Sequence, residues 1–155
     1  ITPIFIIFKN LGMLNSLFAL VLVNTTFHFP FNSILMRGFV GGIDYTIEEA
    51  AQIDGCSRLG AIWHVLLPVL KPGIATIAAY GFISCWNEFL FSFMFISKQN
   101  KLTLPVGLKN LVGEFSINYG QLAAGAVIAV VPTLILFSYV QKNLVGGLSS
   151  GAVKG

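Results

Sequence analysis

Long uncharged stretches alternate with short charged segments along this chain. Residues 10–36 and residues 115–141 contain no charged side chain, so each stretch is 27 residues long. At about 1.5 Å of rise per residue, each makes a helix of roughly 40 Å, longer than the roughly 30 Å hydrocarbon core of a bilayer. The pattern predicts two membrane-spanning helices, over about 12–35 and about 121–140.

A third apolar stretch runs from Pro72 to Ser97 and contains one charged residue, Glu88. It predicts a third span over about 73–96. The opening run ITPIFIIF, residues 1–8, has no basic segment before it and no small-residue cleavage site after it, unlike a signal peptide. We expect this run to be the tail of a further span, and the chain to be a fragment of a longer protein.

The expected fold is an all-α membrane protein, a polytopic bundle of transmembrane helices joined by two sizeable loops at 38–71 and 97–120. Composition agrees with this expectation. The 155 residues are 55% hydrophobic and 10% charged, with a mean hydropathy of +0.83, whereas soluble domains carry about 25% charged residues. Membrane lipid is therefore an expected partner.

The charged and reactive side chains exclude several classes of function. The nine basic residues, which leave a net charge of +3, are scattered singly, and because they form no run or stripe we expect no nucleic-acid partner. Cys56 and Cys85 lack the spacing of metal ligands or of a redox pair, and His28 and His64 stand alone. We expect no metal site and no catalytic residue.

Carboxylates are concentrated in the first loop. Of the six acidic residues in the chain, four fall within eleven positions, at Asp44, Glu48, Glu49 and Asp54. Carboxylates are stabilised in the first turn of a helix, where the helix dipole is positive. Their concentration therefore indicates a folded segment at the point where the chain leaves the membrane.

Local rules predict a short helix in this segment. Thr46 and Glu49 fit a capping box, which starts the helix at Ile47. Gly55 ends the helix, because glycine readily adopts the left-handed conformation that follows many helix C-termini.

A second helix is predicted after the glycine, capped by either Asp54 or Ser57. We expect it to stop or bend at Pro68, before Pro72 leads into the next span. Its apolar residues recur at helical spacing, at Leu59, Ile62, Trp63, Leu66 and Leu70.

Two short helices at an angle form a knob outside the membrane, which suggests docking onto a partner. Ala50 and Ala51 offer a smooth surface that loses no side-chain entropy on docking, and Glu49 can bind a cation on the partner. The alternative is that Glu49 only caps its own helix. The two roles are compatible.

The spacing in this segment resembles the EAA loop of ABC-type importer permeases, EAA-x3-G-x9-I-x-LP. Here the pattern reads Glu49-Ala50-Ala51, Gly55, Val65 in place of isoleucine, and Leu67-Pro68. One departure is Asp44-Tyr45, where many relatives have a proline, and we expect Thr46 to supply the helix cap instead.

The surrounding sequence is similar to the carbohydrate-uptake branch of that superfamily, in the subgroup that supplies the second of two permease subunits. The resemblance covers nearly the whole chain and is weakest before about residue 30. It implies that residues 1–155 are the C-terminal part of one transmembrane domain. It rests on AAQIDG at 50–55, LLPVLKPGI at 66–74, WNEF at 86–89, LTLPVGL at 102–108 and GAVKG at 151–155.

The resemblance implies a mechanism. In this family the EAA loop is a cytoplasmic coupling helix that sits in a cleft of an ATP-hydrolysing subunit, and an external solute-binding protein delivers the substrate. ATP closes the ATPase dimer, the permease pair turns outward-facing, and hydrolysis resets it. Carried over to this chain, the docking surface consists of Glu49, Ala50, Ala51 and Gly55, with Asp54 supporting the corner. The implied partners are a second permease subunit, ATPase subunits, a solute-binding protein and a sugar.

The resemblance also implies the location and orientation. It places the chain in a bacterial or archaeal cytoplasmic membrane, with 38–71 and the C-terminal tail inside and 97–120 outside. Five basic residues inside against four outside do not decide the orientation by themselves. The chain has no GxxxxGK[ST] loop, so we expect ATP to be used by another polypeptide, and this chain to be no enzyme and to bind no cofactor. The ending GAVKG either contacts the ATPase or is disordered.

Glu88 is the one charged residue within a predicted span. An ionisable group inside a membrane costs a few kcal/mol unless it is paired or hydrated, so it is a functional candidate. The neighbouring Trp86 and Asn87 suit stacking on a sugar and hydrogen bonding to its hydroxyls. We expect these three residues to line the substrate path, and the alternative is a polar cap at the outer interface, where tryptophan is enriched.

Two other functions are compatible with a polytopic membrane protein. Within the superfamily, the solute would be an amino acid, a peptide or an ion instead of a sugar. An ion-coupled secondary transporter would need inverted repeats, broken helices or several buried acids at the midplane, and Glu88 alone offers such an acid.

Overall fold

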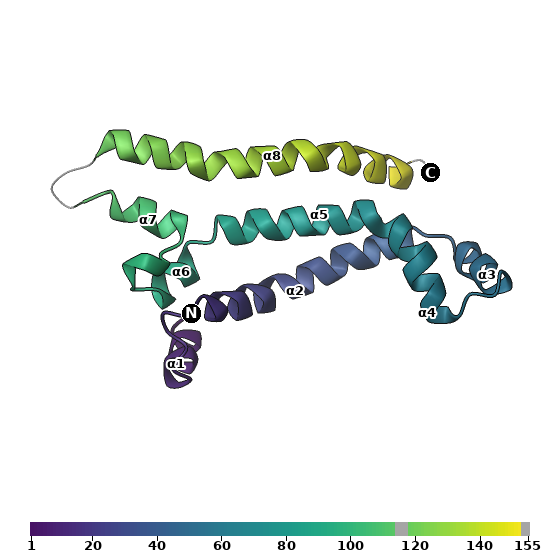
Figure 1. Ribbon diagram of the computed structural model, residues 1–155, viewed down its shortest axis with the longest axis horizontal. Coiled ribbons are helices and arrows are strands. Elements are labelled where there is room, and N and C mark those ends of the chain that lie inside the picture. The colour runs from purple at the N-terminus through teal and green to yellow at the C-terminus, as the bar shows by residue number, and fades with distance from the viewer. Residues whose placement is uncertain (114–117, 153–155) are drawn as a thin grey trace. The chain divides into compact units, whose positions relative to one another are not determined.

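The computed structural model describes residues 1–113 and 118–152, and their regular structure is helical (Figure 1). The predicted all-α fold is confirmed. Two short elements differ from α-helix: η1, Ile62–Leu66, is π-helical, and η2, Gln99–Lys101, is a 3-10 turn. In chain order the elements are α1 Thr2–Asn10, α2 Leu17–Gly41, α3 Tyr45–Ile53, α4 Arg58–Ala61, η1 Ile62–Leu66, α5 Leu67–Trp86, α6 Leu90–Phe95, η2 Gln99–Lys101, α7 Leu104–Asn110 and α8 Tyr119–Ala152.

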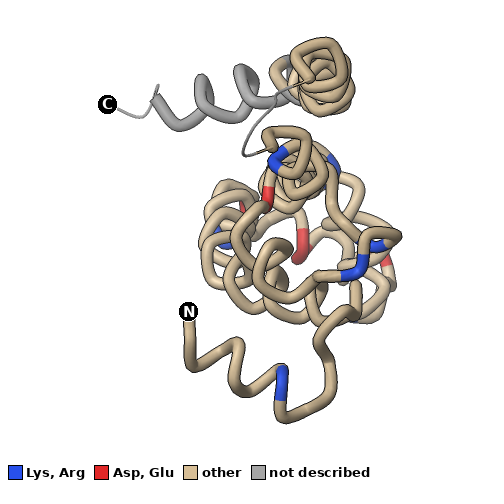
Figure 2. Tube along the Cα trace, turned by 90° about the vertical axis from the view of Figure 1, so that its left-hand side faces the viewer, with Lys and Arg blue, Asp and Glu red and all other residues tan. Residues whose placement is uncertain are grey.

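Three stretches within the described ranges are long and apolar enough to cross a membrane. They are α2, the continuous stretch Arg58–Trp86 that contains α5, and Tyr119–Ser138 of α8. Figure 2 shows how few charged positions the chain carries. Large apolar side chains on these helices, such as Phe29 and Ile135, are exposed, which suits contact with lipid or with further helices rather than with water.

The predicted span 73–96 is not one helix, and this part of the prediction is wrong. α5 starts earlier, at Leu67, and ends at Trp86, and the separate helix α6 begins at Leu90. The break follows from the polar pair Asn87-Glu88. The Glu88 carboxylate accepts hydrogen bonds from first-turn amides of α6, which favours starting a new helix over continuing the old one.

The other predicted spans differ from the helices at their ends. Where 12–35 was predicted, α2 starts only at Leu17, because the preceding turn needs left-handed residues at Gly12 (φ +66°) and Asn15 (φ +59°). α2 then continues past Pro30 to Gly41.

The terminal helices also differ from the predicted bounds. α1 covers Thr2–Asn10 where a partial span 1–8 was predicted, and α8 extends through Ala152 where the predicted span ended near 140. Of the predicted ending GAVKG, residues 153–155 lie outside the described residues, as do residues 114–117 of the predicted external loop.

The described chain divides into two compact units, of which the first comprises residues 1–29 and 82–135. In it, the Phe95 ring stacks on Phe8 at a centroid distance of 4.9 Å. The Trp86 indole N–H donates to the Ala129 carbonyl of α8 at 3.0 Å. The buried core of this unit consists of Ala19, Leu20, Val23, Phe95 and Ile96.

The second unit comprises residues 30–81 and 136–155. In it, α2 and α5 approach closely where Phe39 faces Gly73, since a Cβ at position 73 would lie 2.6 Å from the Phe39 ring. Farther along the same two helices, the Phe31 and Tyr80 rings are 4.9 Å apart. After the C-terminal end of α2, α3 packs on α4 and η1.

Candidate functional site

The acidic segment folds as two short helices, α3 and α4–η1, joined at a glycine. We call residues 44–66 the helix corner (Figure 1). The predicted capping box is wrong, because α3 starts at Tyr45 and is capped by Asp44, whose Oδ1 accepts from the Thr46 amide at 3.0 Å. An aspartate at this position satisfies a helix N–H as well as a threonine does and adds a favourable charge–dipole interaction.

The predicted turn at Gly55 is confirmed. Gly55 has φ +89°, its amide donates to the Gln52 carbonyl at 3.1 Å, and the Cys56 amide donates to the Ala51 carbonyl at 3.0 Å. This pair of bonds is the Schellman arrangement that closes a helix C-terminus. The glycine therefore fixes the angle between α3 and α4.

The second helix starts as predicted and continues farther. Ser57 caps it, accepting from the Gly60 amide at 3.1 Å, and this selects between the two predicted caps. The helix does not stop at Pro68, so that part of the prediction is wrong. The chain passes through the π-helical turn η1, in which the Leu67 amide donates to the Ile62 carbonyl, and continues directly into α5. Because Pro68 has no N–H to give to the turn before it, the wider π-turn precedes it.

The predicted docking residues lie together on the helix corner, and not all of them face outward. Glu49, Ala50, Asp54 and Gly55 are exposed. Ala51 is only 6% exposed and lies on the inner side of α3. Its small side chain therefore permits close packing within the corner rather than offering surface to a partner.

Glu48, which the sequence pattern did not single out from its neighbours, contacts side chains of both α3 and α4. It accepts from Gln52 Nε2 at 3.3 Å and lies 3.7 Å from Arg58 Nε of α4. The Arg58 side chain is largely exposed, so this ion pair contributes little to stability. Its effect is to connect the two helices across the corner.

Several apolar side chains of the corner are exposed, among them Leu59 and Trp63 of the helical apolar pattern predicted for the second helix. Tyr45 and Ile53, at the two ends of α3, are 82% and 86% exposed, and Leu59 and Trp63 are also largely exposed. Exposed apolar groups beside a carboxylate are typical of a protein interface. Helical spacing alone does not tell a packed face from a docking face.

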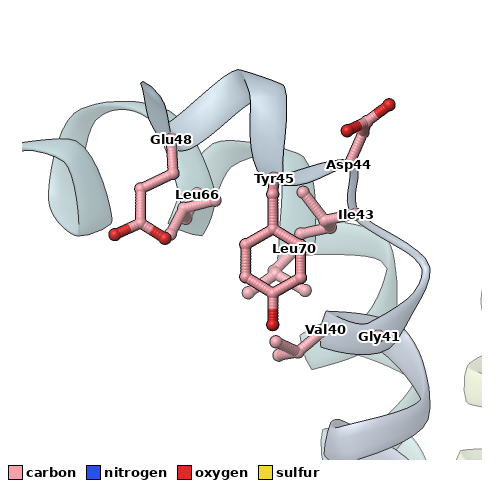
Figure 3. Close-up of a pocket in the computed structure, with 8 residues that line it drawn as sticks. All are labelled: Val40, Gly41, Ile43, Asp44, Tyr45, Glu48, Leu66 and Leu70. Carbon is pink, nitrogen blue, oxygen red and sulfur yellow. The ribbon is translucent and has the colours of Figure 1, made fainter. Parts of the chain in front are cut away.

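A small open cleft of about 130 Å³ lies where α2, α3 and α5 meet. Figure 3 shows the Tyr45 ring reaching from the start of α3 toward Val40, with the Asp44 carboxylate directed away from the other side chains. The lining residues are Val40, Gly41, Ile43, Asp44, Tyr45, Glu48, Leu66 and Leu70. The cleft is largely apolar, with Glu48 at its edge.

The polar triplet Trp86-Asn87-Glu88 lies at the break between α5 and α6, and each side chain makes a hydrogen bond. Trp86 donates to Ala129, and Asn87 Nδ2 donates to the Ile83 carbonyl at 2.8 Å. Glu88 accepts from the Phe91 and Ser92 amides and the Ser92 hydroxyl, at 2.6, 2.9 and 2.8 Å. The Glu88 carboxylate thereby caps the first turn of α6.

The described residues contain no cluster of side chains suited to binding a metal ion. No group of three or more His, Cys, Asp and Glu side chains in residues 1–113 and 118–152 is placed to hold an ion.

Comparison with known proteins gives a family and several named relatives. The family described as binding-protein-dependent transport system inner membrane component matches residues 1–149. The sulfoquinovosyl glycerol transport system permease protein SmoH of Agrobacterium fabrum is 37% identical over 155 residues, all of this chain and 54% of the relative. The diacetylchitobiose uptake system permease protein DasC of Streptomyces coelicolor is also 37% identical, over all of this chain and 56% of the relative.

A further relative and a solved structure agree with these. The galactooligosaccharides transport system permease protein GanQ of Bacillus subtilis is 36% identical over 98% of this chain and 54% of the relative. The crystal structure of a bacterial ABC transporter involved in the import of the acidic polysaccharide alginate matches with a TM-score of 0.70 and 31% identity, over 92% of this chain and 55% of that chain. This chain spans about half the length of these proteins. It belongs to the family of binding-protein-dependent transport system inner membrane components.

Proposed function

We propose that this chain is part of a permease subunit of an ATP-binding-cassette importer, and that its helix corner docks on a separate ATP-hydrolysing subunit. The observation that carries the proposal is the conformation of the EAA-spaced segment. Its glycine has φ +89° and turns the chain between two short helices, and Glu49, Ala50 and Asp54 on this segment are exposed, as are large apolar side chains beside them. A rigid knob of this kind loses little entropy on docking.

We infer that the solute is a sugar or a related carbohydrate. SmoH, DasC and GanQ are named for transport of sulfoquinovosyl glycerol, diacetylchitobiose and galactooligosaccharides. Their shared solute class supports a carbohydrate over an amino acid, a peptide or an ion. Thermal shift of the accompanying solute-binding protein against a panel of neutral and acidic oligosaccharides, with amino acids as controls, tests this inference.

The proposed orientation follows from the docking role. The helix corner and the C-terminal tail face the cytoplasm, and residues 97–120 face outward. The spans lie within α2, α5 and α8. The partners are a second permease subunit, ATPase subunits that bind the nucleotide, and an external solute-binding protein. The chain itself acts as a transport subunit without enzymatic activity or a cofactor of its own.

We propose that the break at 87–89 borders the sugar path. Helix breaks at membrane depth occur where the backbone lines a cavity or is buried in protein. In this role Glu88 positions α6, while the exposed Asn87 lies nearest to the solute. Trp86 fixes the end of α5 against α8.

The docking role is tested with Glu49→Gln in the complete complex. We expect the sugar-stimulated part of the ATPase rate to fall several-fold while the unstimulated rate persists, because loss of a charge at an interface weakens docking by about 1–3 kcal/mol. Asn110→Ala, an exposed polar site at the end of α7, is the control. Unchanged stimulation in Glu49→Gln, with normal assembly, contradicts a charge contact at this residue.

A further inference from the structure

Two side chains are placed to donate to the backbone carbonyl of Ala129 in α8. The Trp86 indole N–H, at the end of α5, donates to this oxygen at 3.0 Å. Thr133 follows Ala129 by one helical turn, and a threonine hydroxyl within a helix commonly donates to the carbonyl three or four residues before it. All three residues belong to the first compact unit. The Ala129 oxygen is therefore an acceptor that both side chains can reach.

The Thr133 hydroxyl has no hydrogen bond. Its oxygen is buried and without a partner among the described residues. Thr26 of α2 and Thr76 of α5 differ from it, since each hydroxyl donates to the carbonyl four residues earlier, at 2.8 and 2.9 Å. The corresponding acceptor for Thr133 is Ala129. In a regular helix that carbonyl already accepts the amide of the following turn, so the indole takes the lone pair that the hydroxyl would use.

The same turn of α8 contains Pro132. Proline has no N–H, so the carbonyl four residues before it receives no helical amide, and the helix is weakened at this point. Within a membrane such a turn is stabilised by groups of neighbouring helices or by serine and threonine hydroxyls. Trp86 provides the first kind of stabilisation and Thr133 is placed to provide the second. A hydroxyl that bonds back to its own helix also favours a bend.

We propose that Trp86 and Thr133 form a hydrogen-bond switch at the Ala129 carbonyl. In one arrangement the indole holds the end of α5 to α8, as in the structure. In the other, the indole withdraws, the Thr133 side chain rotates about χ1, and its hydroxyl donates to Ala129 while α8 bends at Pro132. Each arrangement leaves one donor without this acceptor, so the two differ little in free energy and a movement of the helices selects between them.

The inference rests on the proposed function, in which ATP use by a partner subunit moves the helices. It adds a role for Thr133, a residue that lies outside both the helix corner and the break at 87–89. Phe82, whose ring stacks on Trp86 at a centroid distance of 5.5 Å, orients the indole from within α5. The switch therefore needs no large rearrangement of α5 itself.

The test is ¹⁹F NMR of the complete complex labelled with 5-fluorotryptophan, in which the Trp86 signal is the one lost in Trp86→Phe. We expect a bonded and a released signal, whose ratio changes severalfold when ATP and vanadate trap the complex. Thr133→Val removes the competing hydroxyl and keeps the shape of the side chain. It should raise the ratio of bonded to released signal about fivefold, because a net hydrogen bond contributes about that factor. Thr133→Ser keeps a hydroxyl and should stay close to the wild type.

The matched control is Thr26→Val in the same unit, whose hydroxyl bonds within α2 and which should leave the Trp86 signals unchanged. The proposal is overturned if Thr133→Val leaves the ratio unchanged, or if Thr26→Val shifts it equally. It is also overturned by a single Trp86 signal at the same position with and without ATP and vanadate, in a complex that hydrolyses ATP. The ratios are first measured without nucleotide, so they test the exchange at Ala129 even in a complex that hydrolyses no ATP, a result that would refute only the proposed function.

Discussion

Replacing Gly55 by alanine tests whether the conformation of the helix corner matters for coupling. Gly55 has φ +89°, and a Cβ at this position would meet nothing within 4 Å. The substitution therefore adds conformational strain without a steric clash. An L-residue in the left-handed region costs about 1–2 kcal/mol relative to glycine, which corresponds to roughly a 5- to 30-fold loss in the population of the correctly angled corner.

The assay is sugar-stimulated ATPase activity of the reassembled complex, with the unstimulated rate measured beside it. We expect Gly55→Ala to lose most of the stimulation, and Gly55→Asn to lose less, because asparagine tolerates positive φ better than alanine. Gly12→Ala is the matched control. Gly12 has φ +66° and equally open surroundings but lies in the α1–α2 turn. The alanine substitution should therefore strain that turn and leave the stimulation of ATPase activity intact.

Two results would refute this reasoning. Equal losses in Gly55→Ala and Gly55→Asn would show that φ is not the cause. Wild-type stimulation in Gly55→Ala, in a complex that assembles normally, would show that the angle at the corner is not needed for coupling.

Three further predictions concern packing and capping. Gly73→Ala places a Cβ 2.6–2.9 Å from three atoms of the Phe39 ring and should lower the Tm of the complex in detergent. Gly125→Ala is the control, because its Cβ meets the flexible end of the Leu108 side chain and should be tolerated. Equal Tm values for the two variants would contradict this contrast. Glu88→Gln, which keeps the shape of the cap but weakens charge-assisted bonds, should cost about 1–2 kcal/mol of unfolding free energy in denaturant titration, and no loss would show that the cap is dispensable. Asp44→Ala should cost about 0.5–2 kcal/mol of α3 stability, read by hydrogen exchange of the Thr46 amide, and unchanged exchange would contradict its role as the cap.

The helices with long uncharged stretches were predictable, because membrane thickness sets their length and charged residues interrupt them. Their ends were not, in part because some depend on contacts between distant residues. α2 starts at Leu17 because Asn15 bonds to residues 97 and 98. The break after Trp86 is local in origin, because the Glu88 carboxylate accepts from the amides of residues 91 and 92, and spacing alone did not rank this cap above a continuous helix.

The helix corner was predicted in outline from local rules, which act within a few residues. Gly55 and Ser57 act as those rules predict. The cap at Asp44 was missed because Thr46, two residues later, is also a favoured capping residue, and sequence spacing does not show which of the two caps the helix. The inward position of Ala51 was missed because it depends on how α3 packs on α4, which no local pattern encodes.

The π-turn at Ile62–Leu66 makes the two exits from the helix corner mechanically unequal. On the α4 side the chain stays helical from Arg58 to Trp86, so no loop absorbs a displacement. On the α3 side the link to α2 is a short turn that begins at Gly42, directly after Gly41 ends α2, and such a turn bends more easily than a helix. Under the proposed docking role, a displacement of the corner passes to α5 through continuous helix, whereas α2 is joined to the corner only by this short turn.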